Sequence, residues 1–198
     1  MAERFRPRLY RDQDLEHLPV EKVVEEICAL QDELRQFWSD AEGWAPIEAA
    51  ELLSKSRLDW QVSLSHYLKT WLEKREGEGE ARGLILAWVN LGSLVEGTLM
   101  LFLSVHYRDY KASLQGIKEQ LGDPDSLVLD KLRKFVRDNV WMDAEGRKWD
   151  AWIANVQQRR NSIHAFRDRQ VGSHDEFLKA VRMYLRFLRF VDGHLPYP

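Results

Sequence analysis

The chain has 198 residues, of which 31% are charged, and its formal net charge is −3 with histidine neutral. This length is sufficient for one domain with a substantial core and does not require a second domain. The nearly balanced charge excludes the general nucleic-acid binders that carry a positive field over their whole surface, so any contact with RNA has to be local.

The residue 1–19 segment contains Pro7 and Pro19 and shows no apolar periodicity, which predicts an N-terminal arm. From Val20, apolar residues recur at helical spacing and predict a first helix that ends near residues 39–43. Pro46 suits the first turn of a second helix, which we expect to run to about Lys74. A charged, glycine-containing loop is predicted over residues 75–80.

The third predicted helix, residues 81–107, is the most apolar segment, and its part from Leu84 to Val105 is long enough to cross a membrane. Asn90, Ser93 and Glu96 lie within it, and an acidic residue near the centre of a helix is costly in lipid. We therefore expect a central core helix and no membrane segment. Its small and polar residues form a narrow seam that permits close approach of another helix.

Glu96 requires a cation if that seam is buried. Arg159 or Arg160 is the obvious candidate, and Arg82, Arg108 or water are the alternatives.

A short helix is expected up to residue 121, and Asp123 with Pro124 predicts the start of a fourth main helix that ends near residue 139. A fifth helix is predicted from residue 147 to about residue 166. Ser173 and Glu176 have the spacing of a capping box, which predicts the start of a final helix that ends near Gly193. No segment alternates with period two. The sequence thus predicts an all-α, single-domain bundle of five to six helices over residues 20–193, followed by a tail at 194–198.

Arginines and a histidine interrupt the amphipathic pattern of residues 156–169. At a helical step of about 100° per residue, Arg160 lies about 40° from Val156 and His164 about 80°, whereas Arg159 lies on the opposite shoulder. Arg160 and His164 are then neighbours on one side of the helix, and Arg167 falls within roughly 60° of Val156. A guanidinium on a core-facing stripe indicates either an internal ion pair or a cleft.

This segment also resembles a known family. The run Arg159-Arg160-Asn161-Ser162-Ile163-His164 is similar to the signature of the HEPN superfamily (higher eukaryotes and prokaryotes nucleotide-binding), in which an arginine precedes a histidine by four to six residues. Arg159 to His164 has the family's spacing, whereas Arg160-Asn161 has the family's dipeptide with one residue too few before His164. The resemblance leaves open which arginine corresponds to the catalytic one.

The resemblance implies a HEPN-like helical fold and a metal-independent endoribonuclease. In that interpretation His164 takes the proton of the ribose 2′-hydroxyl, Arg159 or Arg160 stabilises the phosphate, and Asn161 is a supporting polar contact. We add Glu96 and Arg167 as supporting residues. The resemblance further implies a homodimer whose two motifs face one cleft, a toxin or phage-defence setting, and an antitoxin or nucleotidyltransferase partner.

No cofactor or metal is expected, because the sequence contains no glycine-rich phosphate loop and no Cys/His spacing of the zinc type. The single cysteine, Cys28, excludes an internal disulfide and fits a reducing compartment. The basic residues 1–11 lack the apolar segment of a secretory signal, so we expect a cytoplasmic protein.

An alternative of a different class is a non-catalytic HEPN-like binding module or dimerisation scaffold. In this interpretation Arg160 pairs with Glu96, and His164 caps the end of its helix, where the dipole favours a cation. An intermediate case is a member that keeps the fold and binds RNA, nucleotide or a partner without cutting.

Overall fold

All of the regular structure in the described part of this chain is helical. The computed structural model describes residues 15–74, 78–115, 121–164 and 170–197, and within them it contains eight α-helices, three short 3-10 helices and no strand. The α-helices are α1 (Val20–Trp38), α2 (Ile47–Lys55), α3 (Leu58–Tyr67), α4 (Glu78–Val105), α5 (Tyr107–Leu114), α6 (Leu129–Asn139), α7 (Ala144–Arg160) and α8 (His174–Asp192). The 3-10 helices are η3 (Leu68–Trp71), η4 (Pro124–Ser126) and η5 (Asn161–Ile163).

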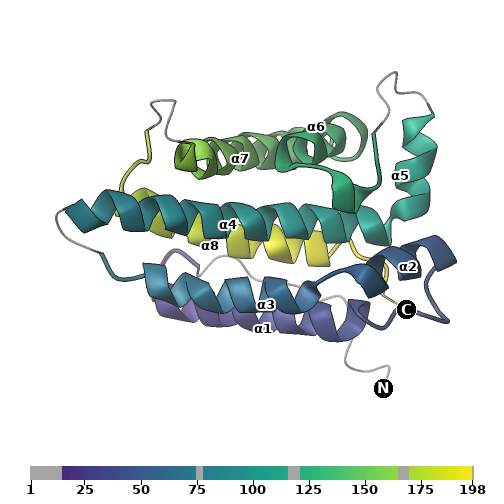
Figure 1. Ribbon diagram of the computed structural model, residues 1–198, viewed down its shortest axis with the longest axis horizontal. Helices are drawn as coiled ribbons and strands as arrows, with labels where there is room; N and C mark the ends of the chain where they lie inside the picture. The colour runs from purple at the N-terminus through teal and green to yellow at the C-terminus, as the bar shows by residue number, and fades with distance from the viewer. Residues whose placement is uncertain (1–14, 75–77, 116–120, 165–169, 198) are drawn as a thin grey trace.

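The long helices lie in three layers (Figure 1). α4 and α8 pack against each other in the middle, α1 and α3 cover one side of them, and α6 and α7 cover the other side. The short helices α2 and α5 lie together at one end of the bundle. This arrangement buries apolar faces of α4 and α8 between two outer layers, as expected for a domain with a single core.

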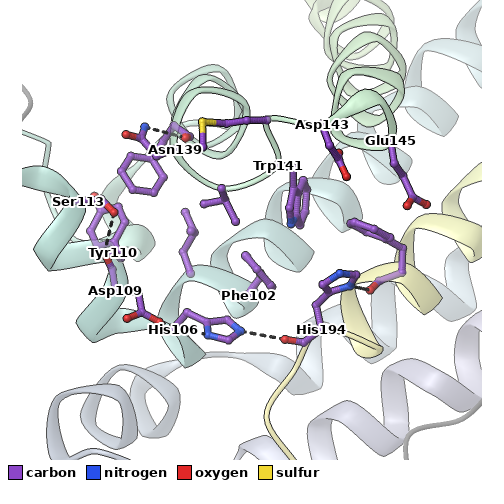
Figure 2. A pocket seen from close by; sticks show the side chains of 15 residues that line it. Phe102, His106, Asp109, Tyr110, Ser113, Asn139, Trp141, Asp143, Glu145 and His194 are labelled. Carbon is purple, nitrogen blue, oxygen red and sulfur yellow. Dashed lines mark hydrogen bonds and ion pairs between the residues drawn. The ribbon is translucent and has the colours of Figure 1, made fainter.

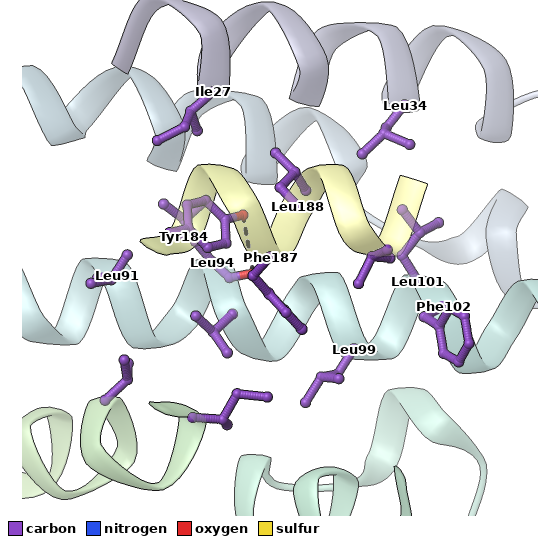
Figure 3. Packing of buried hydrophobic residues seen from close by; sticks show 14 of the residues in the cluster. Ile27, Leu34, Leu91, Leu94, Leu99, Leu101, Phe102, Tyr184, Phe187 and Leu188 are labelled. Carbon is purple, nitrogen blue, oxygen red and sulfur yellow. Dashed lines mark hydrogen bonds between the residues drawn. The ribbon is translucent and has the colours of Figure 1, made fainter. Parts of the chain in front are cut away.

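The core is built where the helical periodicity predicted it. Ile27 and Leu34 of α1, Leu91 and Leu99 of α4, and Leu188 of α8 are buried in one cluster. Figure 3 shows Ile27, Leu34 and Leu188 between α1 and α8, and Leu99 on the opposite side of α4. The prediction of a central core helix is confirmed for α4. Among the described helices α4 alone is long and apolar enough to cross a membrane, and 61% of its most apolar window is buried inside the protein.

The bundle has more helices than the five to six that the sequence predicts. The predicted helix over residues 46–74 is divided into α2, α3 and η3. Ser56 adopts an extended backbone, and both its backbone N–H and its hydroxyl donate to the carbonyl of Leu53, so the helix ends there. Pro124 likewise begins only the short η4, and α6 starts later, at Leu129.

The helix that carries the arginines begins at Ala144, where the Asp143 carboxylate accepts the backbone N–H of Gly146, and it ends at Arg160. The prediction that it continues to about residue 166 is wrong, because residues 161–163 tighten into η5. The capping box at α8 is confirmed: the Ser173 hydroxyl accepts the N–H of Glu176, and the Glu176 carboxylate accepts the N–H of Ser173.

Residues on both sides of the predicted bundle contribute to it. Leu15 and Leu195 are buried, and Tyr197 packs against the core and donates to Asp192. Arg182 of α8 donates to the carbonyls of Leu15 and Leu18 at 2.6 and 2.7 Å.

Candidate functional site

Arg160, the last residue of α7, reaches the carboxylate of Glu96 on α4. The distance from its Nη2 to Glu96 Oε2 is 2.9 Å, and the two side chains are 27% and 16% exposed. Gly92, one turn before Glu96, permits this approach, because a Cβ there would lie 2.6 Å from Arg160 Cδ. The cation that Glu96 requires is therefore Arg160, and the predicted seam of small residues on α4 is where the arginine stem lies.

Glu96 also holds a third helix. Its Oε1 accepts the backbone N–H of Leu129, the first residue of α6, at 2.6 Å. The preceding residue, Val128, offers no capping side chain, so Glu96 satisfies an N–H that the helix itself leaves unpaired. A negative charge at the start of α6 and a positive charge at the end of α7 both complement the helix dipoles. Glu96 thus connects α4, α6 and α7.

Arg159 points to different partners. Its Nη1 donates to the carbonyl of Gln170 at 2.8 Å, and its Nη2 donates to Glu176 Oε1 at 3.2 Å. Its guanidinium carbon lies 5.9 Å from the centre of the Trp88 ring, and its side chain is 14% exposed. The backbone N–H of Ser173, together with Arg159, holds the pKa of Glu176 below its ordinary value. Arg159 thus fixes the segment before α8 to the end of α7.

Gly172 is required in this contact. Its φ is +81°, and a Cβ at this position would overlap Nη1 of Arg159. An L side chain would be strained here and would displace the guanidinium.

His164 lies beyond the end of α7, on an extended backbone, with an exposed side chain. Its backbone N–H donates to the carbonyl of Asn161 at 3.2 Å, and no described residue hydrogen-bonds its imidazole. The prediction that His164 lies one helical turn after Arg160 is wrong, because the helix ends before it. Asn161 follows α7 directly and is half-buried. Arg167 lies outside the described residues.

A polar depression of about 440 Å³ adjoins Arg159. Asn155 and Gln158 of α7 line it together with Arg159 and Gln170. These side chains offer amide and guanidinium N–H groups, the donors that phosphate oxygens accept. The depression is therefore a surface on which an anionic ligand can bind.

A second hollow, of about 610 Å³, lies where α4, α5, α6 and α8 approach the start of α7 (Figure 2). Trp141 and Phe102 form part of its wall, and His106 and His194 lie at one edge, where His106 Nε2 donates to the His194 carbonyl at 3.0 Å. It lies at the opposite end of α7 from Arg159. The sequence does not predict this hollow, because its residues come from distant segments without a local pattern.

No group of three metal-ligating side chains is assembled among the residues that the structure describes. The chain matches no protein-family model, and no curated protein or solved structure shows significant similarity to it. The geometry of these two surfaces and the motif of residues 159–164 are therefore the basis on which a function can be assigned.

Proposed function

We propose that this protein is a metal-independent endoribonuclease of HEPN type, with His164 as the general base and Arg159 as the cation that contacts the phosphate. The observation that carries the proposal is that the two arginines of the motif have different partners and that only one of them lines the polar depression. Arg160 pairs with Glu96 and does not line the polar depression, whereas Arg159, which pairs with Glu176, does line it. His164, four residues after the last residue of α7, is exposed and its imidazole has no described partner.

The chemistry fits these residue types. A neutral imidazole takes the proton of a ribose 2′-hydroxyl, and the resulting oxygen attacks the adjacent phosphorus. The bond from phosphorus to the 5′-oxygen then breaks, the 5′-oxygen keeps its electron pair and takes a proton from water, and the product ends in a 2′,3′-cyclic phosphate. A guanidinium has five N–H groups, and Arg159 uses two of them for Gln170 and Glu176, so three are not used by these two contacts. In the proposed mechanism these N–H groups stabilise the transition-state oxygens.

A homodimer is part of the proposal, because two facing copies would double the cations around the substrate on a chain of net charge −3. The cytoplasmic location, the toxin or defence setting, and an antitoxin or nucleotidyltransferase partner are proposed on the resemblance of residues 159–164. That the fold is HEPN-like is also proposed on the resemblance of residues 159–164.

The test is cleavage of a mixed-sequence RNA by the purified protein in EDTA, beside His164→Ala prepared identically. His66→Ala is the matched control, since His66 is also exposed and lies on α3. We expect the wild type and His66→Ala to cut and leave cyclic phosphate ends, and His164→Ala to be inactive with an unchanged melting temperature. Equal cutting by all three proteins would exclude His164 as the base.

A second candidate is a non-catalytic helical binding module, and the ion pair of Arg160 with Glu96 favours it. In this case the motif is a structural network that joins three helices, and its residues matter for stability alone. If no RNA is cut by any of the three proteins while Glu96→Ala melts at a lower temperature, the binding module replaces the ribonuclease. Sedimentation of wild type with RNA then tests whether the module retains RNA binding.

A further inference from the structure

The hollow in Figure 2 has the dimensions of a small-molecule site. Its volume of about 610 Å³ falls within the range of about 300–1,000 Å³ that is typical of ligand pockets. Four helices and the start of a fifth converge on it, and the connection of residues 140–143 between α6 and α7 completes its wall. It is separate from the arginine motif, because residues at the beginning of α7 line it and the motif lies at the end of that helix.

The walls of the hollow are aromatic. Trp141 lies with its ring centre 5.1 Å from that of Phe102 and 5.1 Å from that of Phe190, and all three line the hollow. Trp141 is 8% exposed, and its indole N–H finds no acceptor among the described residues. Aromatic faces carry partial negative charge and attract cations.

The charged residues at the hollow are all acidic. Asp109, Asp143 and Glu145 line it with exposed side chains, and no lysine or arginine is among its described lining residues. One oxygen of Asp143 accepts the N–H of Gly146, which leaves the other free. The imidazole of His106 is 3.9 Å from Asp109 and is charged only when protonated. At neutral pH the charged side chains that line the hollow are therefore carboxylates, and Arg147 lies beside them, where it donates to the carbonyl of the lining residue Met142 at 3.1 Å.

The two histidines at the edge add acceptors. A carbonyl oxygen only accepts, so His106 Nε2 donates to the His194 carbonyl, and His194 Nδ1 donates to the Phe190 carbonyl at 2.7 Å. In the neutral rings the other nitrogens, Nδ1 of His106 and Nε2 of His194, then carry lone pairs. Figure 2 shows both rings at the same edge.

From the aromatic walls, the acidic edge and these acceptors we infer that the hollow binds an organic cation, an amine whose apolar body contacts Phe102 and Trp141. The carboxylates neutralise the ammonium group, and the same carboxylates repel anionic ligands such as nucleotides. The site is thus distinct in charge from the polar depression beside Arg159.

Three ligands of nearly equal size test this charge preference: 2-phenylethylammonium, 2-phenylethanol and phenylacetate. Binding is measured by calorimetry and by the indole N–H resonances of ¹⁵N-labelled protein, with the Trp141 resonance assigned through Trp141→Phe. We expect saturable binding of the ammonium ion with a shift of the Trp141 resonance, binding of the alcohol about tenfold weaker, and no binding of phenylacetate.

The double variant Asp109→Asn/Glu145→Gln should weaken binding of the ammonium ion by about tenfold, because it removes two charges without changing shape. Glu73→Gln is the matched control, since Glu73 is exposed, follows η3 and does not line the hollow. The inference is overturned if the ammonium ion does not saturate at millimolar concentration, if the anion binds equally well, or if the double variant binds as Glu73→Gln does.

Discussion

Removal of the Glu96 side chain should destabilise the protein more than removal of a surface carboxylate. Glu96→Ala loses the hydrogen bond from the Leu129 N–H at 2.6 Å and the ion pair with Arg160 at 2.9 Å. The hydrogen bond to a charged acceptor contributes about 1.5 kcal/mol. The ion pair contributes about 1 kcal/mol, because partial exposure of both side chains screens it toward the range of surface pairs. The total of about 2.5 kcal/mol corresponds to a fall in melting temperature of about 5–10 °C for a chain of this size.

Calorimetry and urea unfolding measure this effect. Glu96→Gln retains an acceptor for Leu129 and should cost only about 1 kcal/mol. A double-mutant cycle of Glu96→Gln with Arg160→Met isolates the ion pair. The matched control is the exposed pair of Lys22 and Glu25, whose coupling should stay below about 0.5 kcal/mol. If Glu96→Ala melts within about 1 °C of the wild type, the reasoning that this carboxylate joins three helices is refuted.

Three further predictions concern single sites. Gly172→Ala and Gly43→Ala both place an L residue at positive φ, which costs about 1–2 kcal/mol. The alanine at 172 also displaces Arg159, so Gly172→Ala should melt at a lower temperature than Gly43→Ala, and equal melting temperatures would contradict this. The partners of Glu176 lower its pKa, so the carboxylate stabilises the fold at pH values above the ordinary glutamate range, and this stabilisation is lost as pH falls through the lowered pKa. The melting temperature of Glu176→Gln should therefore be lower than that of the wild type at neutral pH and equal to it in acid. Burial raises the pKa of the Cys28 thiol, so a disulfide reagent should label it only as fast as the protein unfolds, and rapid labelling of native protein would refute this.

Helices with one clean apolar face were predictable from the sequence, and helix ends were not. α1 and α8 follow their periodicity because one pattern satisfies both local structure and packing. α4 was predictable for a different reason: it is apolar over most of its girth, as a helix between two layers has to be. The break at Ser56 was missed because a serine is compatible with a helix until its hydroxyl finds a carbonyl to bond. The end of α7 was missed because Ile163 continues the apolar pattern, although its side chain is 50% exposed.

The ion pair of Glu96 was predictable from the sequence because its physical requirement is strict. A carboxylate inside an apolar helix needs a cation, and that requirement alone singled out Glu96 and its candidate arginine partners. Whether Arg159 or Arg160 pairs with Glu96 depended on the space that Gly92 leaves for the arginine stem, and residue spacing in the sequence does not reveal that space. The location of His164 depended on the end of α7. The aromatic hollow depended on segments around residues 102, 141 and 190 meeting in space.

The position of α8 in the chain has a consequence for biosynthesis. α8 packs against both α4 and α1, yet it is the last described helix to leave the ribosome. Until it emerges, the most apolar helix of the protein displays a face that only later residues cover, and α1 lacks one of its main partners. The core therefore closes after synthesis of α8, and nascent chains that end before residue 174 present the kind of exposed apolar helix that chaperones hold.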